Sequence, residues 1–430
     1  MVTIPRTPHT PEQPPPGRLS VGSGPNGLGY LHVDSRPVWA PFANDYPINA
    51  TNQPDHVLEI VEDSKSVKLQ KNTAPVKSSK FIQPSIRTDW LPDTGAPSVH
   101  AASLIALKDG AVRAFWFAGS REGAPDVAIY TSIFDPQATR WSAPTVVVDR
   151  VSAEKGLSRY IAKLGNPVPA RMADGRMQLF FVTVSIGGWA GSSISSMISD
   201  DEGLTWDKPA RLISSPLINL STLVKSPAMS FVDGRLGLPA YHEWIGRFGE
   251  FLRIEANQVI DKRRMSSGRS AIQPVVFADG AQEAQAFFRQ TRPSSQPKQI
   301  PVSETKDAGQ TWAVTKDLEI PNPNSALAAL TLADGTRLMV LNNIEAARYR
   351  LVMVMREPNS SQWQVVQVLD DDESLLNNLH REFSYPYLIS ANGEDAHLTY
   401  TWNRTKIKHI YFPAAWFKHA VSSLKEKEVQ

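Results

Sequence analysis

The stretch SDDEGLTW, residues 199–206, decides how this chain folds. It follows the pattern S-x-D-x-G-x-T-W, in which Asp and Thr side chains bond backbone groups of a tight turn. Glycine supplies the positive φ angle that the turn needs, and the Trp packs beneath it as an apolar anchor. A second copy, with Thr in place of Ser, occupies residues 305–312, and two partial copies occupy 132–141 and 355–363. Two full copies predict a repeated β-unit.

Turn-forming dipeptides recur along the chain from about residue 85. Asp-Gly occurs five times and Asn-Gly once, and several copies clearly separate short apolar runs; the glycines are Gly110, Gly175, Gly234, Gly280, Gly335 and Gly393. Such a dipeptide between two alternating apolar segments is typical of a β-hairpin. Six hairpins at spacings of 46 to 65 residues predict an all-β fold, a six-bladed β-propeller over residues 85–415.

The segments that flank this periodic region differ from it in composition. Residues 1–84 are rich in Pro and Gly and have little periodicity, so they are predicted to form an arm and linker, with PEQPPPG at 11–17 extended or disordered. Residues 416–430 are predicted to be a polar tail, and residues 414–430 to form a helix whose Lys-rich end is solvated.

Composition excludes several classes of protein. The net charge of +2, without long runs of Lys or Arg, gives no reason to expect a nucleic-acid partner. The chain has no cysteine and its histidines lack metal-site spacing, so neither a metal nor a cofactor is expected. No apolar run reaches the length of a membrane span, and residues 1–18 do not resemble a secretory signal. We therefore expect a soluble protein, cytoplasmic unless a signal has been removed from an exported or periplasmic form; no signal indicates an oligomeric state.

One mouth of the predicted channel collects polar side chains. In each blade the first strand runs into the turn and the second runs out, so the start of the first and the end of the second share one face. The first strands begin at His100, Asn166, Lys225, Gln273, Asn324 and Tyr385. The second strands end near Arg121, Ser185, His242-Glu243, Arg289, Asn342-Asn343 and Trp402 to Arg404. Loops at one mouth of a closed β-architecture are where a binding site is expected.

Several residues of this ring have the chemistry of an anion or sugar site. Arg289 and Arg348 suit a carboxylate or sulfate, because guanidinium groups bind such anions bidentately. The loop after the first blade's second strand offers a cation and two carboxylates, Arg121, Glu122 and Asp126, although the same residues fit a surface turn. Tyr385 fits a nucleophile or acid, and also an aromatic floor for a sugar ring. His100 and His242 lie at the same mouth.

The two full copies of the Trp-bearing turn are Asp-boxes, and four phrases accompany them: FAGSREGAPDVAIY at 117–130, IPNPNSA at 320–326, FSYPYLI at 383–389 and YTWNRTKIKHI at 400–410. Together they resemble the sialidase (neuraminidase) superfamily, in particular its BNR-repeat-like members. The resemblance covers roughly residues 95–415 and implies a glycoside hydrolase that cleaves a terminal acidic sugar.

The resemblance also implies roles for individual residues. Arg289 and Arg348 match two of the three arginines that hold the sialate carboxylate. Asp126 matches the acid/base, and Tyr385 matches the nucleophile. The wider predicted substrate-binding set is Arg121, Glu122, Lys225, His242, Glu243, Asn324, Trp402 and Arg404.

Two positions depart from the sialidase pattern. His100 stands where the first arginine is expected, and Gln273 stands where the glutamate that activates the tyrosine is expected. A neutral Gln cannot take the tyrosine proton. His100 is a candidate for the missing cation when protonated, or for a base.

Three functions fit this sequence, all with a glycan as partner. The first is hydrolysis of a terminal sialic acid or another carboxylated sugar such as a uronate, with a tyrosine nucleophile. The second is sugar binding without turnover, with Arg289 and Arg348 as anion contacts and Trp189 and Trp402 as ring platforms. The third is a polysaccharide lyase in which His100 or Tyr385 removes a proton next to a uronate carboxylate.

Overall fold

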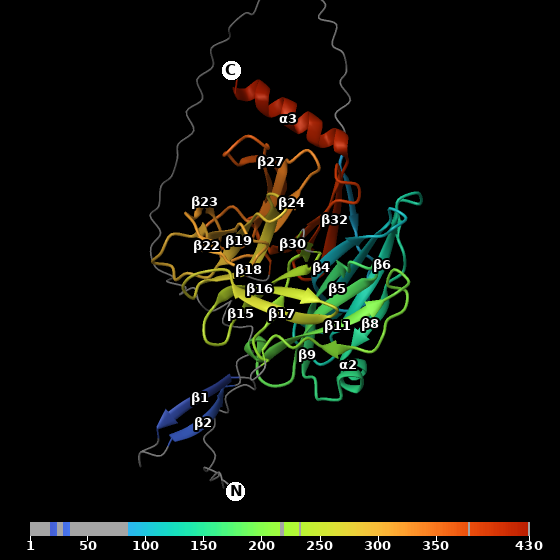
Figure 1. Ribbon diagram of the computed structural model, residues 1–430, viewed down its shortest axis with the longest axis vertical. Helices are drawn as coiled ribbons and strands as arrows, with labels where there is room; N and C mark the ends of the chain where they lie inside the picture. Colours follow the sequence, from blue (N-terminus) through green and yellow to red (C-terminus); the bar gives the residue numbers. More distant parts are fainter. Residues whose placement is uncertain are drawn as a thin grey trace, which may run out of the picture. The chain divides into compact units, whose positions relative to one another are not determined.

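Five of the six Asp-Gly and Asn-Gly dipeptides, and Gly234 of the other, lie between the first two long strands of a sheet, as the sequence predicts. The computed structural model describes residues 18–23, 29–34, 85–215, 219–231, 234–376 and 379–428 (Figure 1). Five of the six turn glycines have φ between 72° and 86°, which only glycine adopts without strain; they are Gly110, Gly175, Gly234, Gly335 and Gly393.

The chain divides into two compact units, residues 1–83 and 84–430. In the first unit the described residues form an antiparallel pair, β1 (Arg18–Ser23) and β2 (Gly29–Asp34). The sequence did not indicate this pair. The segment 11–17, expected to be extended or disordered, lies outside the described residues.

The second unit is a six-bladed β-propeller. The first blade contains β4 (Ser98–Ala106), β5 (Val112–Gly119), β6 (Ala128–Asp135), β7 (Arg140–Trp141) and β8 (Thr145–Asp149). The second contains β9 (Lys163–Arg171), β10 (Met177–Val184), β11 (Ser192–Ser199) and β12 (Ala210–Arg211). The third contains β13 (Leu223–Val224), β14 (Met229–Ser230), β15 (Leu236–His242), β16 (Phe248–Glu255) and β17 (Gln258–Arg264).

The remaining blades follow the same antiparallel order. The fourth contains β18 (Ala271–Ala278), β19 (Ala284–Gln290), β21 (Val302–Thr305) and β22 (Ala313–Val314). The fifth contains β24 (Ala328–Thr331), β25 (Arg337–Leu341), β26 (Arg350–Arg356) and β27 (Gln364–Asp371). The sixth contains β30 (Phe383–Ile389), β31 (Ala396–Trp402), β32 (Lys406–Phe412) and, from the other end of the propeller sequence, β3 (Arg87–Trp90).

The other elements connect or flank the blades. Two short pairs are β20 (Gln299–Ile300) with β23 (Leu318–Pro321) and β28 (Leu375–Leu376) with β29 (Leu379–His380). The helices among the described residues are α2 (Arg150–Leu157), the 3-10 turn η1 (Trp189–Gly191) and α3 (Ala414–Glu428). Within the described residues, no helix is both long enough and apolar enough to cross a bilayer.

Helix α3 confirms the helix that was expected near the C-terminus, and its first turn is apolar and buried. Trp416 and Phe417 are buried, and their rings lie 4.9 Å and 6.0 Å from the ring of Phe412 at the end of β32. The apolar first turn therefore attaches α3 to the sixth blade.

The two Asp-boxes have the same hydrogen bonds. In the first, Asp201 accepts from the Thr205 backbone N–H at 2.8 Å and from its hydroxyl at 2.6 Å, and Ser199 Oγ accepts from the Gly203 N–H at 2.7 Å. In the second, Asp307 accepts from the Thr311 backbone N–H at 2.8 Å and from its hydroxyl at 2.6 Å, and Thr305 Oγ1 accepts from the Gly309 N–H at 3.0 Å. The bonds from Thr205, and then that from Ser199, lower the pKa of the half-buried Asp201 to about 2, so the turn keeps its anion at neutral pH.

A tryptophan after the third strand of four blades contacts the preceding blade. The ring pairs and centroid distances are Trp206–Phe115 at 5.8 Å, Trp312–Phe251 at 5.4 Å, Trp363–Phe277 at 5.8 Å and Trp141–His409 at 5.1 Å. The last pair joins the first blade to the sixth. The partial turn copies at 132–141 and 355–363 therefore keep this contact without the full Asp-box.

We expect Trp206→Ala to lower the free energy of unfolding by about 2–4 kcal/mol, because it removes a large aromatic contact between two blades. Chemical denaturation measures this change. Leu204→Ala is the matched control: Leu204 lies in the same turn but is 70% exposed, so its loss should change stability by less than about 0.5 kcal/mol. Equal effects of the two substitutions would contradict the role of the Trp contact.

Candidate active site

The site is organised by left-handed residues where the inner strands begin. Gln273 has φ 49° and Tyr385 has φ 55°, a conformation that is uncommon for such residues. Each lies at a register shift, between β18 and β19 and between β30 and β31 respectively, and each precedes a proline. A bulge of this kind re-aims the side chain. Strain at such positions is retained where the site needs the geometry.

Gln273 connects the two bulges. Its Nε2 donates to the Tyr385 hydroxyl at 3.2 Å and lies 3.3 Å from the Tyr241 hydroxyl, while its Oε1 accepts from Arg289 Nη1 at 3.2 Å. The guanidinium can only donate, so it fixes the amide oxygen on its own side and the amide nitrogen toward the tyrosines. Gln273 is therefore a donor to Tyr385. Asn166, which belongs to the second blade, donates through Nδ2 to the Tyr241 hydroxyl at 3.4 Å.

Asn324 joins two arginines of the site. Its Oδ1 accepts from Arg289 Nε at 2.7 Å, and its backbone oxygen accepts from Arg348 Nη2 at 3.0 Å. Asn324 itself is left-handed, with φ 63°, which Asn tolerates better than most residues. The fourth and fifth blades thus place two guanidinium groups around one asparagine.

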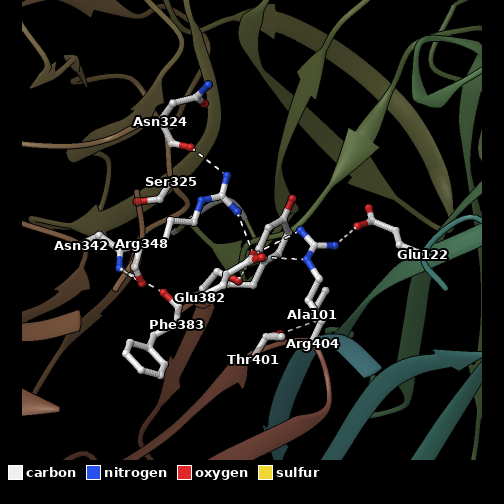
Figure 2. Close-up of polar contacts among 12 residues, drawn as sticks. Ala101, Glu122, Asn324, Ser325, Asn342, Arg348, Glu382, Phe383, Thr401 and Arg404 are labelled. Atoms are coloured by element: carbon white, nitrogen blue, oxygen red, sulfur yellow. Dashed lines mark hydrogen bonds and ion pairs between the residues drawn. The ribbon is translucent and has the colours of Figure 1, made fainter. Parts of the chain in front are cut away.

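Glu382 holds Arg348 and Arg404 around one carboxylate (Figure 2). Its Oε1 accepts from Arg348 Nη1 at 3.0 Å and from Arg404 Nη2 at 3.2 Å, and its Oε2 accepts from Arg404 Nε at 2.8 Å. Arg404 also donates through Nη1 to Glu122. Because Glu122 follows the second strand of the first blade, this chain of contacts crosses the closure between the sixth blade and the first.

Electrostatics keep these carboxylates ionised. Burial acts to raise the pKa of Glu382, but the guanidinium groups of Arg404 and Arg348 outweigh it and hold the pKa well below 4.5. The pKa of Glu122 is lowered in the same way: Arg404 outweighs the effect of burial. The ion pairs are therefore complete at neutral pH.

His100 lies against Tyr385 but carries no charge at neutral pH. The two ring centroids are 4.3 Å apart, and burial, aided by Arg404, lowers the pKa of His100 to about 3. Both ring nitrogens are buried and have no hydrogen-bond partner among the described residues. The left-handed residue of this strand is the neighbouring Ala101, whose N–H donates to Thr401 Oγ at 3.2 Å. His100 therefore does not supply a cation at pH 7.

Asp126 and Arg121 lie on the exposed part of the loop that follows β5. The Asp126 carboxylate accepts from the backbone N–H of Ser120 at 2.8 Å and from its hydroxyl at 2.9 Å. The effect of burial is outweighed by these bonds and by Arg121, so the pKa of Asp126 is lowered. Arg121 lies close enough to Asp126 and Lys163 for their charges to interact. The side-chain hydrogen bonds of Asp126 are with Ser120.

Lys225 is buried. Its Nζ donates to the backbone oxygens of Leu327, at 2.9 Å, and Pro386, so it joins the third blade to the fifth and sixth. Burial, and then the charge of Arg289, lower the pKa of Lys225 to about 7. These contacts make Lys225 a support of the channel wall.

Three further residues that were predicted to bind substrate, His242, Trp402 and Glu243, each interact with other side chains of the propeller. The His242 ring stacks on Phe248 at 4.7 Å and accepts from the Ile245 N–H at 3.2 Å. Trp402 packs on Trp90 at 5.7 Å. Glu243 lies close enough to Arg289 for their charges to interact, and burial raises its pKa against that attraction.

Sequence reasoning missed two residues of this network. Glu382 stands three residues before Tyr385 and directly before the phrase FSYPYLI of the sixth blade, and a carboxylate just before an inner strand was a usable signal. Tyr241 is buried one residue before the end of β15. Nothing near it in the sequence connects it to Gln273.

Comparison with known proteins identifies the family. The sequence model of the BNR repeat-like domain matches residues 110–398, more than half of the chain. The chain belongs to the BNR repeat-like family. No curated protein matches the sequence.

Solved structures share the fold of this BNR repeat-like protein. A Hadza microbial sialidase has a TM-score of 0.60 at 13% identity, with 74% of this chain and 66% of that chain covered. The NanB sialidase from Streptococcus pneumoniae has a TM-score of 0.58 at 12% identity, with 75% of this chain and 69% of that chain covered. Trypanosoma rangeli sialidase has a TM-score of 0.59 at 12% identity, with 80% of this chain and 62% of that chain covered. The chain spans about two thirds of these sialidases, and at such identity the likeness shows the fold alone.

We expect Glu382→Gln to lower the free energy of unfolding at pH 7 by about 2–3 kcal/mol, because two guanidinium groups lose their shared anion; the 23% exposure of Glu382 moderates the effect. The folded-state pKa of Glu382 is depressed, so its contribution is complete above 4.5 and is lost as the pH falls through the lower folded value. Denaturation between pH 3 and pH 7 should show the variant and the wild type converging in acid. Glu373→Gln, an exposed control, should show no such gap.

Proposed function

We propose that this BNR repeat-like protein is a sialidase-type glycoside hydrolase that releases a terminal acidic sugar from a glycan. The observation that carries the proposal is the environment of Tyr385. Its hydroxyl is bonded to Gln273, which is bonded to Arg289, and Arg289 is linked through Asn324 to Arg348. A phenol beside a set of guanidinium groups is suited to reaction at a sugar that carries an acid group.

In this proposal Arg289 and Arg348 hold the acid group of the sugar. A guanidinium donates two parallel hydrogen bonds to a carboxylate, and Asn324 keeps the two groups in position. Arg289 is buried, so it acts in a low-dielectric environment where its interaction with an anion is strengthened. Sialic acid and uronic acids both provide the required carboxylate.

Bond cleavage is assigned to Asp126 and Tyr385. A proton moves from Asp126 to the leaving oxygen as the bond to the anomeric carbon breaks, and the Tyr385 oxygen forms the new bond as its own proton leaves to solvent. Water then hydrolyses the tyrosyl intermediate. The lowered pKa of Asp126 means that the acid form is present in acidic solution, so turnover should fall as the pH rises toward 7.

Turnover of a fluorogenic sialoside tests the proposal. Asp126→Asn and Tyr385→Phe should each reduce kcat/KM by about a hundredfold or more, as expected for a lost acid or nucleophile, without a change in the thermal midpoint. Tyr411→Phe, on the third strand of the sixth blade, is the control and should retain activity. Full activity of either active-site variant would exclude that residue from the mechanism.

Sugar binding without turnover is the second candidate, and one observation favours it. Gln273 donates to Tyr385 and has no carboxylate with which to take its proton. A binding protein would keep the arginines and lose the chemistry.

Gln273→Glu separates the two candidates. The new carboxylate would accept the Tyr385 proton while Arg289 holds it ionised, so a hydrolase that lacks only this base should turn over the sialoside at least about tenfold faster. Gln273→Ala, which removes the amide and adds no base, should be slower than the wild type. Tight binding of N-acetylneuraminate with no turnover in the wild type and in Gln273→Glu would support the binding protein.

A further inference from the structure

Four cations beside the Asp126 loop have no counter-ion among the described residues. Arg121 and Lys163 form an inner pair on the first and second blades. Arg159, which follows α2, and Arg211, on the outer strand β12, form an outer pair. Throughout the described part of the chain, none of the four makes an ion pair or a side-chain hydrogen bond. We call these four residues the basic track.

Lys163 lies against the loop that carries Asp126. It is the first residue of β9, and a Cβ at Gly123 would lie 3.4 Å from its Cδ. Lys163 is half-buried, and its charge repels that of Arg121. Burial first, and then this repulsion, lower the pKa of Lys163 against a weaker attraction from Glu122. The inner pair therefore keeps two like charges together beside the loop.

The outer pair is brought together by the contact of α2 with β12. Gly156, near the end of α2, packs on the ring of Pro209, just before β12. Arg159 is half-buried, and burial, followed by the charge of Arg211, lowers its pKa. Tyr160, directly after Arg159, is 63% exposed. The outer pair thus combines two cations with an accessible aromatic ring.

The carboxylates of the same segments already have partners. Residues 120–126 and 149–163 contain four carboxylates. Each bonds another side chain, in the pairs Glu122–Arg404, Asp126–Ser120, Asp149–Ser152 and Glu154–Arg150. Like charges without a counter-ion oppose folding through their repulsion, and a bound anion removes that repulsion. The basic track therefore suits a ligand that carries several negative charges.

We propose that the basic track binds an acidic polysaccharide on the leaving-group side of the site, so that the substrate carries a carboxylate or sulfate on more than one sugar. The inference rests on the proposed function, in which Asp126 protonates the leaving oxygen and so marks where the rest of the chain leaves. The track starts at that loop. Its outer half follows α2, which begins after Asp149, the residue opposite Ala128 in the sheet.

The track has a different task from the arginines of the pocket. Arg289 and Arg348 hold the acid group of the terminal sugar, whereas the track contacts acid groups of the sugars that follow it. Tyr160 offers an aromatic face to one of their rings. Several weak contacts along one chain add up to a much higher affinity than any one of them, so the track favours a polymer over a single sugar.

Isothermal titration calorimetry with the full chain tests the proposal, with polysialic acid and polygalacturonate as acidic polymers and dextran as a neutral one. Arg159→Gln combined with Arg211→Gln should weaken binding of whichever acidic polymer the wild type binds by about tenfold, because two exposed ionic contacts are lost. Arg159→Lys combined with Arg211→Lys keeps both charges and should lose less. The wild type should not bind dextran.

Three comparisons isolate the track. Arg140→Gln combined with Lys306→Gln removes the same charge from exposed positions in turns after third strands, at the other end of the blades, and should bind polymer as the wild type does. Lys163→Gln, in the inner pair, should weaken binding by about threefold or more. Added NaCl should weaken polymer binding more in the wild type than in the Arg159 and Arg211 glutamine variant, because salt screens exposed charges.

The outcomes separate this inference from the proposed function. Equal polymer affinity in the Arg159 and Arg211 glutamine variant and in the Arg140 and Lys306 control would overturn the inference. Displacement of the polymer by a DNA duplex or by anionic lipid vesicles, as effective at equal charge as displacement by the free polymer, would also overturn it. A wild type that hydrolyses the sialoside but binds no acidic polymer would overturn the inference alone. Polymer binding through the track without hydrolysis would overturn only the hydrolase.

Discussion

Aromatic packing between neighbouring blades is the interaction on which the rest of this structure depends. The four tryptophans that end the third-strand turns each contact the blade before them, and Trp141 does so across the closure of the ring. Each contact fixes how one sheet lies against the next. The candidate site draws its residues from all six blades, both from strands and from the loops between them, so its geometry depends on how the blades lie against one another. Sites built on rigid elements of this kind hold their side chains in place before a ligand arrives.

The sequence predicted the parts of the fold that have local causes. The turn glycines need positive φ angles and the Asp-box needs Asp and Thr at fixed spacing, so both are visible within a few residues. The polar starts of the inner strands were visible for the same reason, and they brought Gln273 and Tyr385 together correctly. The bulges were not predicted, although the proline after each of Asn166, Gln273 and Tyr385 was a usable signal, because proline cannot donate to the ladder of a sheet.

The contacts that decide the electrostatics of the site have no local cause. Arg404 and Glu122 are 282 residues apart, and their pairing exists only because the ring closes between them. The neutral state of His100 depends on burial, which the sequence around it does not reveal. Glu382 is recognisable as a carboxylate near Tyr385, but its role as the shared partner of Arg348 and Arg404 depends on two other segments. The sequence named Arg404 and Glu122 as candidates, but it could not show that they pair.

The sixth sheet combines strands from both ends of the propeller. β3 (Arg87–Trp90) pairs with β32, with Arg87 opposite Tyr411. The first strand of the propeller in the sequence therefore cannot pair until β32, its last strand, has been synthesised. The first five blades consist of consecutive hairpins that can pair as they leave the ribosome, whereas this contact has very high sequence separation and a correspondingly slow, entropically costly closure. During synthesis the growing propeller is therefore an open arc whose two end sheets are uncovered, and the candidate site, which spans the closure, is assembled in the last step of folding.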